Sequence, residues 1–210
     1  MRYHLSWLTD KFDNGESLEY IFFSGHAAAA NKTSKFVGEL ALSQWFPSTF
    51  TVNNVAYKTA GHWMMDRKAF LFRDMESYHK ILNADRIEEA RAFGRNIKGF
   101  DELKWMEWRY EIVREGNFHK FNQSKKLRAY LLNTGSAILA EANPADVVWG
   151  IGLKPDSRLA KNPYTWNGQN LLGFALMEVR DYFRSYSQLA LVIEGTSGAA
   201  QNKNPEPIIS

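Results

Sequence analysis

The chain has 210 residues, which is enough for one domain with a sizeable buried core, and its lack of cysteine excludes disulfides and thiolate metal sites. A formal net charge of +3 is too small to indicate nucleic-acid binding by itself. Aromatic residues make up 14% of the chain and include seven tryptophans, which predicts a large core or a surface that stacks a base or a sugar.

Helical patterns dominate the chain, and short aromatic or β-branched runs supply a few strands. In chain order the sequence predicts a strand at Tyr20–Phe23, a surface loop at Gly25–Gly38, a strand at Phe50–Val55, a helix from Thr59 to about Phe72, a helix from Asn83 or Asp85 to Gly94, a helix from Asp101 toward Gly116, a helix from Ser124 to just before Gly135, a strand at Ile138–Ala142, an irregular loop at Asn143–Pro163 and a last helix at Gly168–Tyr186.

This pattern predicts an α+β fold: a single, mostly helical domain over residues 1–195 with a small β-sheet. Residues 196–210 are rich in Gly, Ser, Asn, Gln and Pro, so we expect a flexible C-terminal tail there. Met1–Asp10 carries charge without an apolar run, and no stretch approaches the ~18 apolar residues of a membrane span. We therefore expect a cytoplasmic protein, and a monomer.

Four stretches carry a family pattern in order and spacing. They are LSQWFP at Leu42–Pro47 with YKTAGHWMMDRKAFLF at Tyr57–Phe72; Gly94–Arg95 with Trp105; KF at Lys120–Phe121 with TG at Thr134–Gly135; and EANPADVVWGIGL at Glu141–Leu153 with WNGQNLLGFALMEVR at Trp166–Arg180. Over roughly residues 20–186 the chain resembles the NADAR (YbiA-like) family of N-glycosidases. The resemblance implies a mostly helical α+β fold and an enzyme that cleaves N-glycosidic bonds to a ribose or a ribose phosphate without a cofactor.

The resemblance also implies two substrate classes. One is ADP-ribose attached to a nucleobase, guanine in DNA above all, and members of this class act as antitoxins beside DarT-type ADP-ribosyltransferases. The other is the phosphoribosyl-amine intermediates of riboflavin synthesis. The WGIGL loop, the long Gly25–Gly38 segment and the basic run Lys120–Arg128 favour the first class, although such a run is also typical of a solvated helix start.

Position 61 departs from the family, which carries a glutamate where this chain has Gly61. Cleavage of an N-glycosidic bond builds positive charge at the ribose, and a carboxylate in the first turn of this helix could stabilise that charge or activate a water. Gly61 allows three interpretations: an inactivated variant, a natural ligand binder, or an enzyme in which another group acts. If the carboxylate has been lost, Gly61→Glu is expected to raise turnover, and the helix is expected to tolerate it.

Lys68 lies two helical turns after Gly61 and is expected on the same face. Its amine could hold a phosphate or attack C1 of an opened ribose, or it could be a plain surface cation. Asp146 could act on the substrate, by contacting the ribose or by orienting the attacking water. Alternatively, it could cap a turn through its own backbone. Glu141 is a further carboxylate, which could instead pair with an arginine. Gly61, Lys68 and Asp146 are thus the catalytic candidates.

A second set of residues matches positions expected to bind substrate. The aromatic residues could stack a base or pack in the core, the arginine could clamp a phosphate or complement the helix dipole, and the histidine could be a packed, helix-bonding residue. The set is His62, Arg95, Trp105, Trp149, Gly150 and Asn170. None of the histidines shows metal-ligand spacing, so we expect no metal site.

Overall fold

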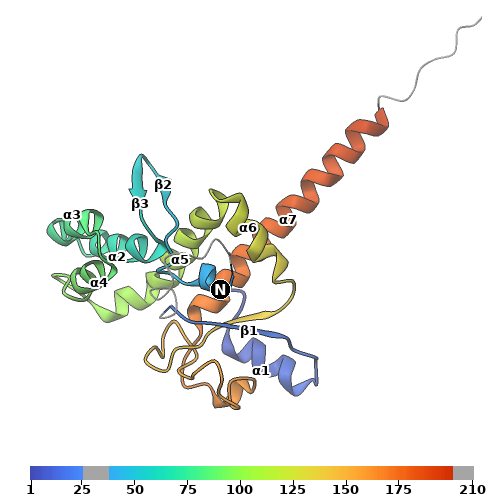
Figure 1. Cartoon of the computed structure of the whole chain (residues 1–210), viewed down its shortest axis with the longest axis horizontal. Helices are drawn as coiled ribbons and strands as arrows, with labels where there is room; N and C mark the ends of the chain where they lie inside the picture. The colour runs from blue at the N-terminus through green and yellow to red at the C-terminus, as the bar shows by residue number, and fades with distance from the viewer. Residues whose placement is uncertain (26–37, 201–210) are drawn as a thin grey trace, which may run out of the picture.

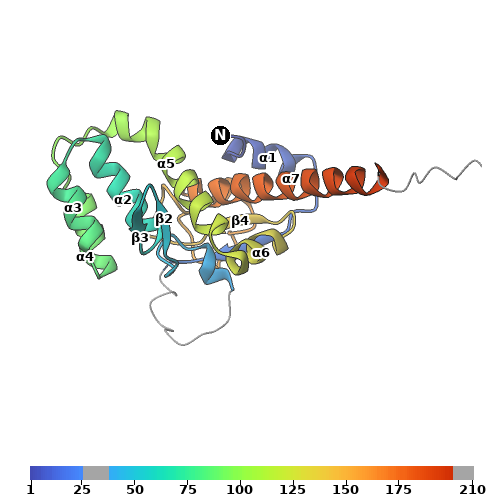
Figure 2. The same cartoon turned by 90° about the horizontal axis from the view of Figure 1, so that it is seen from above.

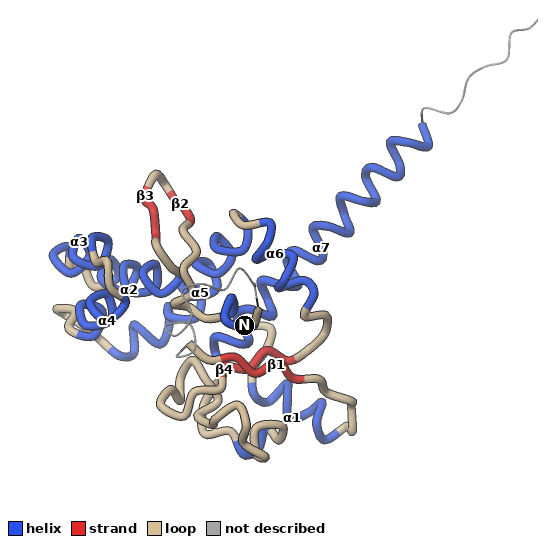
Figure 3. The backbone as a smooth tube through the Cα atoms, viewed as in Figure 1, coloured by secondary structure: helices blue, strands red, loops and turns tan. Residues whose placement is uncertain are grey.

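In the computed structural model the described residues are 1–25 and 38–200, with side chains described as far as residue 186. The fold is α+β and mostly helical (Figure 3), as predicted. The elements, in chain order, are α1 (Leu5–Asp13), β1 (Tyr20–Phe23), the short 3-10 helix η2 (Glu39–Leu42), β2 (Phe50–Val52), β3 (Val55–Tyr57), α2 (Ala60–Leu71), α3 (Met75–Asn83), α4 (Ile87–Arg95), α5 (Glu102–Asn122), α6 (Lys125–Asn133), β4 (Ile138–Glu141), η3 (Pro163–Thr165) and α7 (Leu171–Ala200).

Among the described residues the strands form two separate pairs. β1 and β4 are parallel, with Tyr20 opposite Ile138. β2 and β3 are antiparallel, so the single strand predicted at Phe50–Val55 is wrong. Asn53 and Asn54 have φ values of 49° and 64°, the left-handed pair that a two-residue hairpin turn requires and that asparagine tolerates.

Three helix starts were predicted correctly because a short polar side chain caps each one. Thr59 accepts a hydrogen bond from the His62 N–H, and Asp101 and Ser124 cap α5 and α6 in the same way. The helix expected to begin at Asn83 or Asp85 is instead α4, preceded by Arg86. The short helices α1 and α3 were not predicted.

The last helix begins and ends later than predicted, running from Leu171 to Ala200. Leu189, Ala190 and Leu191 are good helix formers, so helix propensity continues the backbone past Tyr186. The tail predicted from residue 196 is therefore helical as far as Ala200, and residues 201–210 lie outside the described part. Most of the predicted Gly25–Gly38 loop lies outside it as well. No helix among the described residues is long and apolar enough to span a membrane.

The elements fall into two groups joined by α5 and α7. Helices α2, α3 and α4 lie together at one end, while β1, β4 and α1 lie at the other (Figures 1 and 2). The first half of α7 packs into the main core, and its predicted apolar face is buried: Leu172, Leu176, Val179 and Phe183. The second half of α7 projects away from the body (Figure 1).

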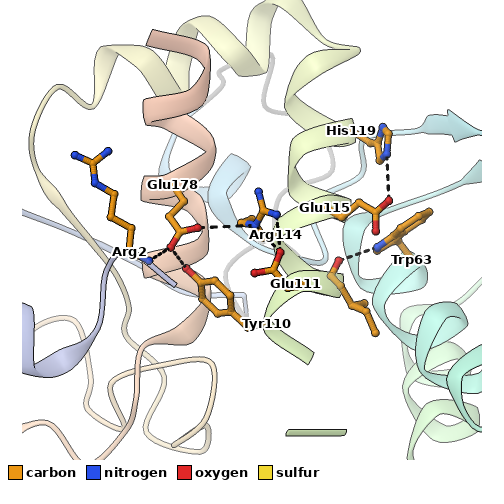
Figure 4. A network of polar contacts seen from close by, with 9 residues as sticks. Arg2, Trp63, Tyr110, Glu111, Arg114, Glu115, His119 and Glu178 are labelled. Carbon is orange, nitrogen blue, oxygen red and sulfur yellow. Dashed lines mark hydrogen bonds and ion pairs between the residues drawn. The ribbon is translucent and has the colours of Figure 1, made fainter. Parts of the chain in front are cut away.

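Polar contacts fasten α5 to its neighbours on both sides (Figure 4). The Tyr110 hydroxyl donates to Oε1 of Glu178 on α7 at 2.9 Å, and Arg114 lies 3.8 Å from the other carboxylate oxygen. On the opposite side, Nε1 of Trp63 on α2 donates to the Ile112 carbonyl oxygen at 2.8 Å. These contacts fix α2 relative to α7, and thereby relative to β4, which packs beside α7.

Candidate functional site

The LSQWFP segment is held in place by a buried lysine. Lys120 on α5 is 1% exposed, and its Nζ donates to the carbonyl oxygens of Ala41 at 2.6 Å and Ser43 at 2.8 Å. Burial lowers the pKa of this amine to about 7. The basic run Lys120–Arg128 therefore does not present all its cations to solvent. Lys120 has to be removed from the predicted basic patch, because its amine is buried and bonds two backbone carbonyl oxygens.

Trp45 lies within this anchored segment and packs against Gly61. The Gly61 N–H donates to the Gln44 carbonyl oxygen at 2.7 Å, joining the first turn of α2 to the residue before Trp45. A Cβ atom at position 61 would lie 2.5 Å from Cε3 of Trp45. Gly61→Glu therefore requires the Trp45 indole to shift, a cost that the expectation from helix propensity did not include.

Glu141 lies at the end of β4 and is held there by backbone contacts. Its N–H donates to Oδ1 of Asn170 at 3.0 Å, and its carbonyl oxygen accepts from the Ile151 N–H at 2.8 Å. Gly150 makes this close approach possible: a Cβ there would lie 2.6 Å from the Glu141 carbonyl oxygen and 3.0 Å from that of Asp146. The loop that follows β4 consequently folds back on the end of the strand and brings residues 141 and 146 together.

The carboxyl groups of Glu141 and Asp146 have different surroundings. Burial, aided by the negative charge of Asp146 and opposed by Arg91 on α4, raises the pKa of Glu141 to about 8. Asp146 is half-buried, and its Oδ1 accepts the N–H groups of Val148 at 3.0 Å and Trp149 at 2.8 Å. The turn-capping interpretation of Asp146 is thus confirmed, while its electrostatic coupling to Glu141 places it at the same site.

Arg91 links these carboxyl groups to Trp45. Its guanidinium carbon lies 4.5 Å from the centre of the Trp45 ring, and both Glu141 and Asp146 attract its charge. Arg95 is exposed four residues later on α4, at the end of the helix. Arg91 therefore places positive charge beside the carboxyl pair, and Arg95 lies near enough to Arg91 to repel it. Arg91 and Trp45 were not singled out from the sequence, although the four-residue spacing to Arg95 and the LSQWFP motif offered a signal.

The side chain of Lys68 reaches from α2 to the C-terminal end of α4. Its Nζ donates to the Gly94 carbonyl oxygen at 3.0 Å and lies 5.4 Å from the centre of the Trp105 ring. Burial lowers the pKa of Lys68, and Glu102 opposes this effect. The helix thus brings Lys68 next to Arg95, and the plain surface interpretation does not describe a half-buried amine.

Several residues of the predicted binding set are buried, and their polar atoms bond to other parts of the protein. Asn170 is 0% exposed, and its amide bonds both Glu141 and Leu139, so it positions β4 rather than reaching a ligand. His62 is 2% exposed, with Nδ1 2.9 Å from the Thr59 hydroxyl. Trp105 is buried in the main core, whereas Trp149 is half-buried against it. Among the described residues, no three His, Asp or Glu side chains gather in a way that could hold a metal ion.

Comparisons with known proteins agree with this arrangement. A model of the NADAR domain family matches residues 22–184. The chain is 37% identical over 171 residues to an N-glycosidase of Acanthamoeba polyphaga mimivirus, covering 79% of this chain and 97% of that relative. It is 27% identical over 151 residues to a riboflavin biosynthesis protein of Vibrio vulnificus, covering 72% of this chain and 37% of that relative.

A solved structure shows the same fold. The chain is similar to the NMR structure of the E. coli protein YbiA, with a TM-score of 0.63 and 23% identity, covering 81% of this chain and 88% of that one. The α+β fold predicted from the sequence is confirmed. The family match spans most of the chain and a viral N-glycosidase aligns along nearly its full length. The chain therefore belongs to the NADAR domain family.

Proposed function

We propose that this chain hydrolyses an N-glycosidic bond between a ribose and a nucleobase. The observation that carries the proposal is the carboxyl pair of Glu141 and Asp146 beside Arg91 of α4. Two neighbouring carboxyl groups with unequal environments are the arrangement from which acid and base roles arise. A pKa of about 8 keeps Glu141 protonated at neutral pH, so it can protonate the departing base. Asp146 faces the ribose, where it stabilises the positive charge or orients the attacking water.

The substrate that we propose is ADP-ribose attached to guanine in DNA. Its pyrophosphate needs two or more cationic donors, and three cations lie on α4 or at its end: Arg91, Arg95 and Lys68. A DarT-type ADP-ribosyltransferase would supply this substrate, with the chain acting as its antitoxin. We further propose that it works as a cytoplasmic monomer. The outward basic surface is smaller than the sequence indicated, because Lys120 points inward.

The second candidate substrate is a phosphoribosyl-amine intermediate of riboflavin synthesis. The similarity to a Vibrio riboflavin biosynthesis protein favours it. Such a metabolite carries one phosphate, so it would need fewer cations than ADP-ribose. The third candidate is a non-catalytic ADP-ribose binder, and only Gly61 motivates it.

Single-turnover release of ADP-ribose from a modified oligonucleotide tests the proposal. The chain should release ADP-ribose, and Glu141→Gln should slow release by about 10²–10⁴-fold, the range typical of a lost general acid. Glu107→Gln is the matched control, because Glu107 is exposed on α5. EDTA should change neither the rate nor the Kd for ADP-ribose measured by calorimetry. Turnover of only the phosphoribosyl-amine would favour the second candidate, and tight binding without turnover the third.

A further inference from the structure

A cleft of about 430 Å³ lies at the opposite end of β4 from Glu141. Because β1 and β4 are parallel, the carboxyl ends of both strands lie toward Glu141, while their amino ends, near Leu18 and Ile138, border the cleft. Three residues along a strand span about 10 Å, so the cleft is separate from the candidate site. Its volume is that of a pocket for a small molecule.

One wall of the cleft belongs to α1, which precedes the residues matched by the NADAR family model (Figure 2). Trp7 and Lys11 line this wall, and Arg180 and Arg184 of α7 line another. The Tyr3 hydroxyl, just before α1, donates to a carboxylate of α7 and so holds the two helices together. The cleft therefore depends on the N-terminal segment of this chain as well as on the family domain.

Arg180 is a buried cation that uses only part of its guanidinium. It is 2% exposed, and its Nη1 donates to the Thr134 hydroxyl at 2.9 Å and to the Ala137 carbonyl oxygen at 2.8 Å. Its Nε is buried without a hydrogen-bond partner among the described residues. A buried donor without a partner is costly, and more so when it is charged. An acceptor that a ligand brings into the cleft would therefore be favoured.

The surroundings of Arg180 carry an excess of positive charge. Asp181 attracts Arg180 and lies 3.6 Å from Nη1 of Arg184. The same carboxylate lies 3.1 Å from Nη1 of Arg2 and accepts from the Tyr3 hydroxyl. One carboxylate thus serves three arginines, and guanidinium groups bind phosphate through two parallel hydrogen bonds. This part of the cleft favours a phosphate group.

The remainder of the cleft offers acceptors and apolar surface. Glu16 is paired with Lys11 at 2.6 Å, whereas Glu19 is exposed and lines the cleft. A carboxylate such as that of Glu19 accepts hydrogen bonds from hydroxyl groups. Trp7 and Met177 contribute apolar surface. A bare phosphate would fill only a small part of this volume, and a phosphate that carries a hydroxylated carbon skeleton fits both halves.

We propose that this cleft is an accessory binding site for a sugar phosphate, with the phosphate against Arg180 and Arg184 and the hydroxyl groups toward Glu19. The proposal goes beyond the proposed function, since it needs neither Glu141 nor turnover. Arg180 also bonds the Ala137 carbonyl oxygen, just before β4. The bound phosphate would therefore hold the start of the strand whose end carries Glu141.

Calorimetry with ribose 5-phosphate, inorganic phosphate and ribose tests the class of ligand. Ribose 5-phosphate should bind at least tenfold more tightly than either of the others, because only it reaches both the arginines and Glu19. Arg184→Gln should weaken its binding about 10–100-fold, the effect of one lost hydrogen bond between charged groups. Glu19→Gln should weaken ribose 5-phosphate but not inorganic phosphate. Arg158→Gln is the control, since Arg158 is exposed outside the cleft. Equal affinities for the two phosphates, or an unchanged Kd in Arg184→Gln, would overturn the proposal.

Methyl NMR places the bound sugar phosphate. Met177 is 1% exposed and lines the cleft, whereas Met75 is exposed on α3. In a chain labelled at its methionine methyl groups, with one signal assigned through Met177→Leu, ribose 5-phosphate should shift the Met177 signal saturably and leave Met75 unmoved. Lys68→Ala should not change the Kd read from Met177, because Lys68 belongs to the candidate site. A Met177 signal that does not respond, or a Kd that depends on Lys68 and not on Arg184, would refute the accessory site. Turnover is not measured, so failure of the proposed function leaves this result intact.

Discussion

The side-chain amide of Asn170 fixes Glu141 at the end of its strand: Oδ1 accepts the Glu141 N–H at 3.0 Å, and Nδ2 donates to the Leu139 carbonyl oxygen at 2.9 Å. Asn170 itself has a φ of 52°, a left-handed conformation that asparagine tolerates better than most residues. One residue at the start of α7 thus satisfies two backbone groups of β4. The strand end and the loop that follows it are therefore positioned from α7.

Replacement of Asn170 should damage both stability and the site. Asn170→Ala removes two buried hydrogen bonds worth about 1 kcal/mol each and places alanine in a left-handed conformation at about 1 kcal/mol, so the free energy of unfolding should fall by about 2–4 kcal/mol. Urea unfolding measures this. Asn170→Gly should recover about 1 kcal/mol of the loss, because glycine adopts the same φ without strain. Equal stabilities for the parent and Asn170→Ala would contradict the role.

Stability should depend on pH through Glu141. Its pKa is raised to about 8 in the folded chain from 4.5, so the folded state binds the proton more tightly than the unfolded state. The resulting stability is fully present below about pH 4.5 and is lost as the pH rises through about 8. At about 1.4 kcal/mol per pKa unit the complete loss is about 5 kcal/mol at most. The free energy of unfolding of the parent should therefore fall relative to that of Glu141→Gln across this pH window. If the difference between the two free energies stayed constant with pH, Glu141 would not be a buried carboxyl that is protonated in the folded chain.

Lys120 should produce the opposite dependence at higher pH. Its pKa is lowered to about 7 from 10.5, so the unfolded state binds the proton more tightly between these values. The cost of burying the charge is fully present below about pH 7 and disappears as the pH rises toward 10.5. Relative to Lys120→Met, the parent should become more stable over that range. Lys125→Met is the control, since Lys125 is exposed on α6. If the stability difference from the parent did not change with pH for either variant, the pKa of the Lys120 amine would not be lowered by folding.

Lys68 should contribute to turnover as a clamp or as a nucleophile. Loss of one charge-assisted hydrogen bond to a phosphate is worth about 2 kcal/mol, so a clamp predicts a KM about 30-fold higher in Lys68→Ala with little change in kcat. A nucleophile predicts a loss of kcat and a covalent adduct that borohydride traps from the parent chain. The Lys68→Ala chain should be compared with Lys125→Ala. Full activity in Lys68→Ala would remove the residue from the site.

Local signals explain why the helix starts and the family were predictable. Thr59, Asp101 and Ser124 each bond a backbone N–H three residues ahead, a contact that depends only on residue type and spacing. The hairpin was missed because Asn53 and Asn54 interrupt a short β-branched run that reads as continuous. The end of α7 was misplaced because Leu189, Ala190 and Leu191 continue the helix past Tyr186, and the helix then runs through the poor helix formers Gly195–Gly198 to Ala200.

The roles of the site residues depended on contacts between distant segments. The sequence by itself determined the family, the fold class and the absence of glutamate at position 61. Only the tertiary structure decided that an indole from residue 45 fills the space beside Gly61, that Asn170 serves β4, and that Glu141 is the buried carboxyl beside Arg91. The physical reason is that capping and periodicity act within a few residues, whereas the pKa of a carboxyl group is set by burial and by charges that the chain brings together from far apart.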